Sequence, residues 1–199
     1  MSIIGEIQPR ARRATTRTAL IAASALLGLS AGWPSGAGAQ TLPVPSAGLP
    51  GAPTGAQEVP DPGLTYKVVF NLWSAGSPDA VHPMFQRVAR YLNTLAEYGV
   101  PPARRQLTIV VYGPATQFVL KDAAYAARNH GKHNPNAAMI ETLRQAGVIT
   151  RVCSQALLAQ HLEPHDVLPT VELDLWALST RVNLELHGYV VEDELPQGK

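Results

Sequence analysis

The chain contains one cysteine, Cys153, among its 199 residues. A single cysteine excludes an intramolecular disulfide, and the lack of any C-x-x-C motif excludes dithiol exchange of the thioredoxin type within one chain. A lone thiol serves either as a nucleophile, when its thiolate is favoured, or as a small buried hydrophobic group. The sequence leaves both roles open for Cys153.

The chain also lacks a strong excess of charge of one sign. Its formal net charge is +1, and residues 1–39 carry four arginines and one glutamate. The remaining residues therefore carry 12 basic and 14 acidic side chains, a net charge of −2. The basic residues are scattered, and Arg104-Arg105 is their only adjacent pair after residue 39. We expect no nucleic-acid partner and no anionic membrane partner, because both require clustered positive charge.

The N-terminal apolar run is too short for a permanent membrane anchor. It extends from Ala19 to Leu29, whereas a spanning helix needs about 20 apolar residues. Arginines precede this run, and the small residues Ala37-Gly38-Ala39 follow it, as in a secretory signal peptide. We predict a signal peptide at residues 1–39, cleaved before Gln40, and a periplasmic or secreted protein with no membrane span after cleavage. The alternative is an uncleaved N-terminal anchor.

Composition divides the rest of the chain into a linker, a domain and a short tail. Residues 40–63 are rich in Pro, Gly and Ala and show no periodicity, which predicts a flexible linker. Residues 64–195 are long enough for one domain with a hydrophobic core. Residues 196–199 form the predicted tail.

Buried-strand patterns alternate with helix-period patterns along the predicted domain. Strands are predicted at residues 66–73, 107–112, 148–152, 168–173 and 189–192. Helices are predicted at residues 83–98, 115–121, 136–146, 154–162 and 175–186, with an exposed loop at 127–136. The last helix is indicated by Leu175, Leu178, Val182 and Leu186, which recur at spacings of three and four. This order predicts an α/β fold, a single three-layer domain with a mainly parallel five-stranded sheet and helices on both faces.

Cys153 ends the third predicted strand and opens the helix that follows. Reactive groups in parallel α/β folds lie beyond the carboxyl ends of the strands. The first N–H groups of a helix favour a thiolate, so Cys153 is the predicted catalytic residue. Asn71 in the first strand and His161, two turns beyond Cys153, are candidate neighbours of the thiol. Asn71, like Asn93 on the first helix, is otherwise expected to satisfy a buried backbone group.

No motif in the chain indicates a metal or a cofactor. His130 and His133 lie close in sequence, as do His161 and His165, but neither pair matches a known zinc pattern. The turn after the first strand lacks both the Walker lysine pattern and G-x-G-x-x-G. We predict no metal and no cofactor, and a metal-binding accessory role for the loop histidines is the weakest alternative.

Several segments together resemble the DsrE/DsrF-like family, which includes sulfur-relay proteins of the TusD type and the YchN-like proteins. They are YKVVFNLW (66–73), RYLNTLAE (90–97), VVYGPA (110–115), LRQAGVITRVCSQAL (143–157) and ELHGYVV (185–191). The most specific segment is the cysteine followed by SQALL. The resemblance covers nearly the whole predicted domain.

The resemblance implies a function for the thiol. In the sulfur-relay members, the cysteine that matches Cys153 carries a persulfide, and such proteins form trimers or hexamers. Their partners are proteins or small compounds that donate or accept sulfur. Relay members commonly have an Arg-Gly pair after the cysteine, where this chain has Gln160 and His161. Two functions stay open: an exported carrier or sulfurtransferase using Cys153, or a non-catalytic oligomeric binding module in which Cys153 is structural.

Overall fold

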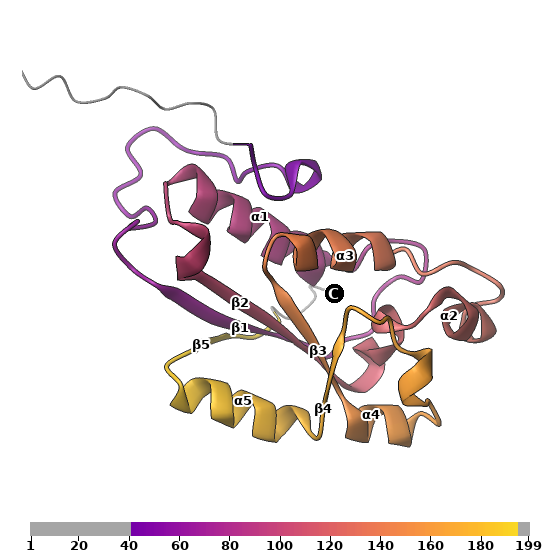
Figure 1. Ribbon diagram of the computed structural model, residues 1–199. Helices are drawn as coiled ribbons and strands as arrows, with labels where there is room; N and C mark the ends of the chain where they lie inside the picture. Colours follow the sequence, from indigo (N-terminus) through magenta and orange to yellow (C-terminus); the bar gives the residue numbers. More distant parts are fainter. Residues whose placement is uncertain (1–40, 195–199) are drawn as a thin grey trace, which may run out of the picture. The chain divides into compact units, whose positions relative to one another are not determined.

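The computed structural model describes residues 41–194, and Figure 1 shows their arrangement. The predicted signal peptide and the tail at 196–199 lie outside the described residues. In chain order, the elements are β1 (Tyr66–Leu72), α1 (Pro83–Glu97), β2 (Arg105–Val111), α2 (Asp122–Arg128), α3 (Ala137–Gln145), β3 (Ile149–Cys153), α4 (Ser154–Ala159), β4 (Glu172–Asp174), α5 (Ala177–Leu186) and β5 (Val190–Glu192). Short 3-10 helices occur at Pro45–Ala47, Pro102–Arg104, Gly113–Val119 and Pro164–Asp166.

The five strands form one sheet in the order β4-β3-β2-β1-β5. All four neighbouring pairs are parallel, which confirms the predicted sheet. β1 and β2 lie near the middle, and each ends in five consecutive buried residues. Such runs are typical of strands covered on both faces. The edge strands β4 and β5 have only three residues each.

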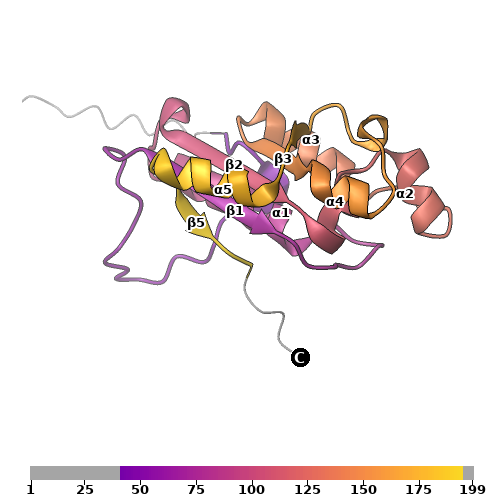
Figure 2. The same cartoon turned by 90° about the horizontal axis from the view of Figure 1, so that it is seen from below.

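Helices cover both faces of the sheet, as predicted. α1 and α3 lie on one side, whereas α4 and α5 lie on the other (Figures 1 and 2). The larger core lies under α1 and α3 and includes Phe70, Leu92 and Ile140. The smaller core lies under α5 and consists of Val69, Val110, Cys153 and Ala177, with partly buried neighbours such as Tyr112 and Leu184. Cys153 therefore belongs to the smaller core, on the sheet face that α5 covers.

The apolar residues whose spacing predicts the last helix, α5, face away from the sheet. Leu175, Leu178, Val182 and Leu186 are 76%, 47%, 43% and 80% exposed, and we call them the α5 stripe. The residues of α5 that pack towards the sheet include Ala177 and Leu184, seven positions apart on one helical face. The helix itself is confirmed, but its most apolar face contacts no other part of the described chain closely enough to be buried.

The segment between β2 and α3 differs from the prediction in detail. The helix predicted at 115–121 is a 3-10 helix at Gly113–Val119, and the start of the predicted loop belongs to α2. Leu120 interrupts the helical path with an extended backbone and forms an isolated bridge with Val167. This long-range pairing separates the two helices, and sequence periodicity carries no signal for it. No helix among residues 41–194 has the length and apolar character needed to cross a bilayer.

Part of the segment predicted as a flexible linker packs against α1. Val44 is fully buried and joins the larger core. Asn93, also fully buried, accepts a hydrogen bond from the Val44 N–H at 2.8 Å. Its amide donates to the carbonyls of Val44 at 2.7 Å and Gly48 at 2.9 Å. Asn93 thus satisfies buried backbone groups, as predicted, and holds residues 44–48 on the domain.

Replacing Asn93 with alanine should lower the free energy of unfolding by about 2–4 kcal/mol, because the buried polar groups of Val44 and the half-buried carbonyl of Gly48 would lose their partner. Chemical denaturation of wild type and Asn93→Ala measures the difference. Gln86→Ala, at an exposed position of the same helix, is the matched control and should change stability by less than about 0.5 kcal/mol. Equal effects of the two substitutions would contradict the role assigned to Asn93.

Candidate functional site

Cys153 lies at the carboxyl end of β3 and is the N-cap residue of α4. Its side chain is on the α5 side of the sheet and is only 3% exposed. Val110 of the neighbouring strand β2 and Val69 of β1, one strand further, belong to the same apolar cluster. The location agrees with the prediction of a thiol at a strand end, while its burial is compatible with either role considered for it.

The hydrogen bond to the thiol comes from α5. The backbone N–H of Ala177, the first residue of α5, donates to Cys153 Sγ at 3.3 Å. The Cys153 side chain makes no capping hydrogen bond to α4, contrary to the expectation that the first N–H groups of α4 would face it. The N-terminus of α5, a ten-residue helix, therefore directs its first backbone N–H at the sulfur.

Asp174 at the end of β4 fixes the start of α5. It is paired in register with Cys153, and its carboxylate accepts from Arg151 Nη1 at 3.0 Å and from Thr180 Oγ1 at 2.8 Å. Arg151 also pairs with Glu172 at 2.8 Å. These contacts join β3, β4 and the first turn of α5, so they hold the Ala177 N–H against the sulfur.

Tyr112 and Arg181 complete the sheet edge beside the thiol. Tyr112 directly follows β2 and packs in the same small core as Cys153. Burial raises the pKa of the Tyr112 hydroxyl, and the positive charge of Arg181 opposes this rise. Arg181 lies one helical turn after Ala177 on the same face of α5. The edge therefore combines a thiol, a phenol and a guanidinium.

Several buried polar atoms on the sheet face that carries Cys153 lack a hydrogen-bond partner among the described residues. The buried atoms Asn71 Oδ1, Arg151 Nε and Arg181 Nε have no partner there. Buried polar atoms nearly always bind another group or an ordered water. A water or a small polar substrate would satisfy them.

Asn71 lies on the same face as Cys153 but does not contact the thiol through a hydrogen bond. It is fully buried in β1, in register with Val110 of β2, which in turn pairs with Arg151 of β3. Its amide donates to Asp193 Oδ1 at 2.5 Å. Asn71 is thus two strands away from Cys153, and it holds the segment that follows β5 rather than a buried backbone group.

His161 lies at the other end of α4 from Cys153. It is exposed, follows the C-cap residue Gln160, and has a left-handed backbone with φ 54°. At about 1.5 Å per helical residue, roughly 12 Å separates it from the N-cap. The Gln160 side chain donates to the Gly113 carbonyl at 2.8 Å. The structure therefore does not bring His161 to the thiol.

A second buried polar cluster was missed by the sequence analysis. Glu194 accepts hydrogen bonds from the Trp73 N–H at 3.0 Å, from the Ser74 N–H at 2.8 Å and from Ser74 Oγ at 2.8 Å. His82 Nε2 lies 3.6 Å from Glu194 Oε1 and 3.5 Å from Ser74 Oγ. His82 Nδ1 accepts from the Met84 N–H at 3.2 Å and so caps α1.

This cluster is not arranged as a catalytic triad. In a triad the two imidazole nitrogens contact different partners, the nucleophile and the carboxylate. Here Ser74 and Glu194 share one nitrogen of His82, and the backbone occupies the other. A Cβ at Gly76 would lie 2.5 Å from His82 Cδ2, so glycine is required there. The cluster fastens the chain after β5 to the turn between β1 and α1.

Two further histidines pair with carboxylates at the surface. His133 pairs with Asp122 at 3.0 Å and His165 with Asp166 at 3.5 Å, both at the surface. Among residues 41–194, no group of three His, Cys, Asp or Glu side chains is close enough together to hold a metal ion.

The fold and the site define a parallel α/β domain whose single thiol lies at the carboxyl edge of the sheet, against the first turn of a helix. Residues 67–191 match the model of the DsrE/DsrF-like family, and this chain belongs to that family. The chain is similar to a solved protein of unknown function, MTH1491, from Methanobacterium thermoautotrophicum. The two share 18% identity with a TM-score of 0.48, over 65% of this chain and 99% of that one. No curated protein matches the chain.

His82 should make stability sensitive to mild acid. Burial lowers its pKa below 6.5, and Glu194 opposes this shift. As the pH falls below 6.5, the unfolded chain binds a proton that the folded chain does not, so stability is lost. We expect the decrease in melting temperature between pH 7.5 and pH 5.5 to be smaller in His82→Gln than in wild type.

The control for this measurement is His165→Gln, because the His165 side chain is 80% exposed. This variant should keep the pH dependence of wild type. An unchanged decrease in melting temperature in His82→Gln would contradict the assignment, whatever the absolute stability of that variant.

Proposed function

We propose that this protein carries sulfane sulfur as a persulfide on Cys153 and passes it to an acceptor thiol. Two observations support this function. Membership of the DsrE/DsrF-like family suggests a role related to sulfur relay. The N–H of Ala177 at 3.3 Å from Sγ, at the positive end of α5, carries the proposal because it favours the nucleophilic thiolate.

The chemistry needs one cysteine and two transfers. In the first transfer, the Cys153 thiolate attacks the sulfane sulfur of a donor such as thiosulfate or a polysulfide. A new S–S bond forms on Cys153 while the S–S bond of the donor breaks, and the leaving group departs as sulfite or as a shortened polysulfide. In the second transfer, an acceptor thiolate attacks the terminal sulfur of the persulfide, and the Cys153 thiolate leaves. No net oxidant or reductant is required.

The surrounding residues have positioning and electrostatic roles in this proposal. The Arg151–Asp174–Thr180 contacts hold the first turn of α5, so the Ala177 N–H stays directed at sulfur. Arg181, whose charge acts on Tyr112, supplies positive charge from α5. In this proposal, Arg181 replaces the arginine that commonly follows the cysteine in relay members, and it stabilises the anionic sulfur.

The burial of the thiol means that the site must open for the sulfur donor. Cys153 is 3% exposed, whereas Leu175 and Trp176, immediately before α5, are 76% and 50% exposed. Because Ala177 contacts the sulfur, movement of this exposed connection would uncover it. An apolar connection is also suited to contact a partner protein during transfer.

The same burial favours a second function, a non-catalytic oligomeric binding module with a structural cysteine. In this alternative, Cys153 acts as a small hydrophobic side chain between Val69, Val110 and Ala177. Its thiol would then react with labelling reagents only after denaturation.

Incubating the mature protein with thiosulfate or polysulfide should add one sulfur atom, which intact mass spectrometry detects. The adduct should disappear with a reductant and be absent from Cys153→Ser. Asp174→Asn should slow its formation several-fold, because it weakens the contacts that hold α5 over the thiol. The absence of an adduct with every donor, together with a thiol that labels only in denaturant, would exclude the relay and support the structural alternative.

We also propose that the protein acts outside the cytoplasm, as the predicted signal peptide indicates. The donors and acceptors would then be periplasmic or extracellular sulfur compounds and thiols. The mass of the protein recovered from the periplasm or the medium tests this proposal. A chain cleaved before Gln40 supports export, and a full-length chain found only in the cytoplasm contradicts it.

We further propose a homo-oligomer that buries the α5 stripe. Exposed apolar surface of this kind marks interaction sites in soluble proteins, and Trp176, which directly precedes Ala177, is also exposed. A closed trimer or hexamer would cover the stripe of every copy by the same contact.

Light scattering after gel filtration should give a trimer or hexamer for the wild type. Val182→Asp should weaken this assembly at least tenfold, because it places a charge in the centre of the stripe. Val59→Asp is the matched control, since Val59 is 41% exposed and Val182 is 43% exposed. A monomeric wild type, or an unchanged assembly in Val182→Asp, would contradict the proposal.

A further inference from the structure

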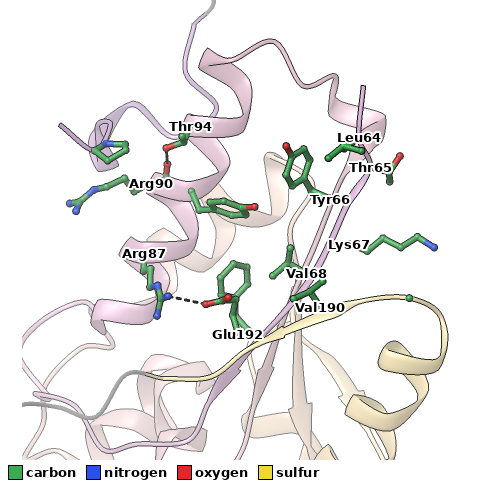
Figure 3. Close-up of a pocket in the computed structure, with 14 residues that line it drawn as sticks. Leu64, Thr65, Tyr66, Lys67, Val68, Arg87, Arg90, Thr94, Val190 and Glu192 are labelled. Carbon is green, nitrogen blue, oxygen red and sulfur yellow. Dashed lines mark hydrogen bonds and ion pairs between the residues drawn. The ribbon is translucent and has the colours of Figure 1, made fainter. Parts of the chain in front are cut away.

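A separate cavity lies on the opposite face of the sheet from Cys153. It is bounded by α1, by β1 and by the edge strand β5, and its volume is about 570 Å³ (Figure 3). Residues 50 and 64–65 of the segment before β1 line its mouth. Small-molecule sites in proteins have volumes of roughly 300–1,000 Å³, so the cavity has the size of a ligand site.

The body of the cavity is apolar and partly aromatic. Val68 and Phe70 of β1 form its floor and are 7% and 3% exposed. The ring of Tyr91 on α1 meets Phe70 edge-on, with 6.0 Å between the ring centroids. Leu64 and Val190 at the rim remain 56% and 63% exposed. An apolar ligand body would cover these side chains and gain the free energy of their burial.

One end of the cavity carries an ion pair. Arg87 Nη2 donates to Glu192 Oε2 at 2.9 Å, and both side chains point into the space between α1 and β5 (Figure 3). This is the only hydrogen bond of the Arg87 guanidinium within residues 41–194, so most of its N–H donors are free there. A guanidinium can bind a second oxyanion while it keeps the first.

The wider charge around the cavity is positive. The lining includes three cations, Lys67, Arg87 and Arg90, and one carboxylate, Glu192. Lys67 and Arg90 point away from the cavity in Figure 3 and bond the carbonyls of His187 and Ala47. Their charges still raise the potential of the cavity, which favours an anion over a cation.

Tyr91 supplies a further polar group. Its hydroxyl has no hydrogen-bond partner among the described residues. Burial raises the pKa of Tyr91, and Glu192 acts in the same direction, so the hydroxyl stays protonated and can donate.

We propose that this cavity binds a small amphipathic anion, a carboxylate or sulfonate with an apolar body, whose head group contacts Arg87. The apolar body lies on Val68, Phe70 and Tyr91, and the head group lies at the Arg87 end. This site is independent of sulfur chemistry at Cys153, from which the sheet separates it.

Fluorescence titration with 8-anilinonaphthalene-1-sulfonate, an aromatic sulfonate, tests the site. Decanoate should displace the probe, and decylamine at the same concentration should not, because the cavity selects a negative head group. Arg87→Gln should weaken binding at least tenfold. Arg144→Gln is the matched control, since Arg144 also lies on a helix and pairs with one glutamate, Glu141 at 2.7 Å, but outside the cavity. It should leave binding unchanged.

Two results would overturn the proposal. One is equal displacement by decanoate and decylamine, and the other is binding that Arg87→Gln does not weaken. Either would show that the probe binds an apolar surface elsewhere, such as the α5 stripe. If Arg87→Gln does not fold, Val190→Trp replaces it, because an indole at the rim fills the mouth of the cavity and should abolish binding.

Discussion

The parallel pairing of all five strands is the constraint on which the rest of the molecule depends. Parallel neighbours require a crossover between every two strands, and each crossover returns the chain to the same edge. The ends of β2, β3 and β4 therefore meet, which places Tyr112, Cys153 and Asp174 side by side although long segments separate them in sequence. The register of β3 with β4 decides that Asp174, rather than another carboxylate, lies beside the cysteine.

Much of this architecture could be predicted from the sequence, because buried parallel strands leave unmistakable apolar runs. The inner strands β1, β2 and β3, the helical layers and the position of Cys153 at a strand end all follow from such runs and from the helix periods between them. The partner of the thiol could not be predicted, since Ala177 donates through its backbone and any residue except proline would do the same. Likewise Glu194 and His82 meet only in three dimensions, and neither belongs to a motif.

α5 shows that sequence periodicity can predict that a helix forms without predicting which of its faces packs against the sheet. The spacing of Leu175, Leu178, Val182 and Leu186 identifies an amphipathic helix, but a spacing does not say which surface receives the apolar face. In this chain the first turns of α5 present Ala177 and Arg181 towards the sheet, and Leu184 packs there only near the other end of the helix. That side leaves room for a buried thiol and a charged neighbour. A leucine-rich face turned inward would fill the same space.

Both ends of the described chain are hydrogen-bonded to the domain. These contacts define the smallest part of the chain that we expect to fold as one unit. Val44 is held by Asn93 on α1, and Glu194 is held by the turn that precedes the same helix. Both residues lie outside the span that matches the family, residues 67–191. A fragment cut to that span would expose part of α1 and leave the amides of Trp73 and Ser74 without their carboxylate. The cooperative unit of this member therefore extends at least from residue 44 to residue 194.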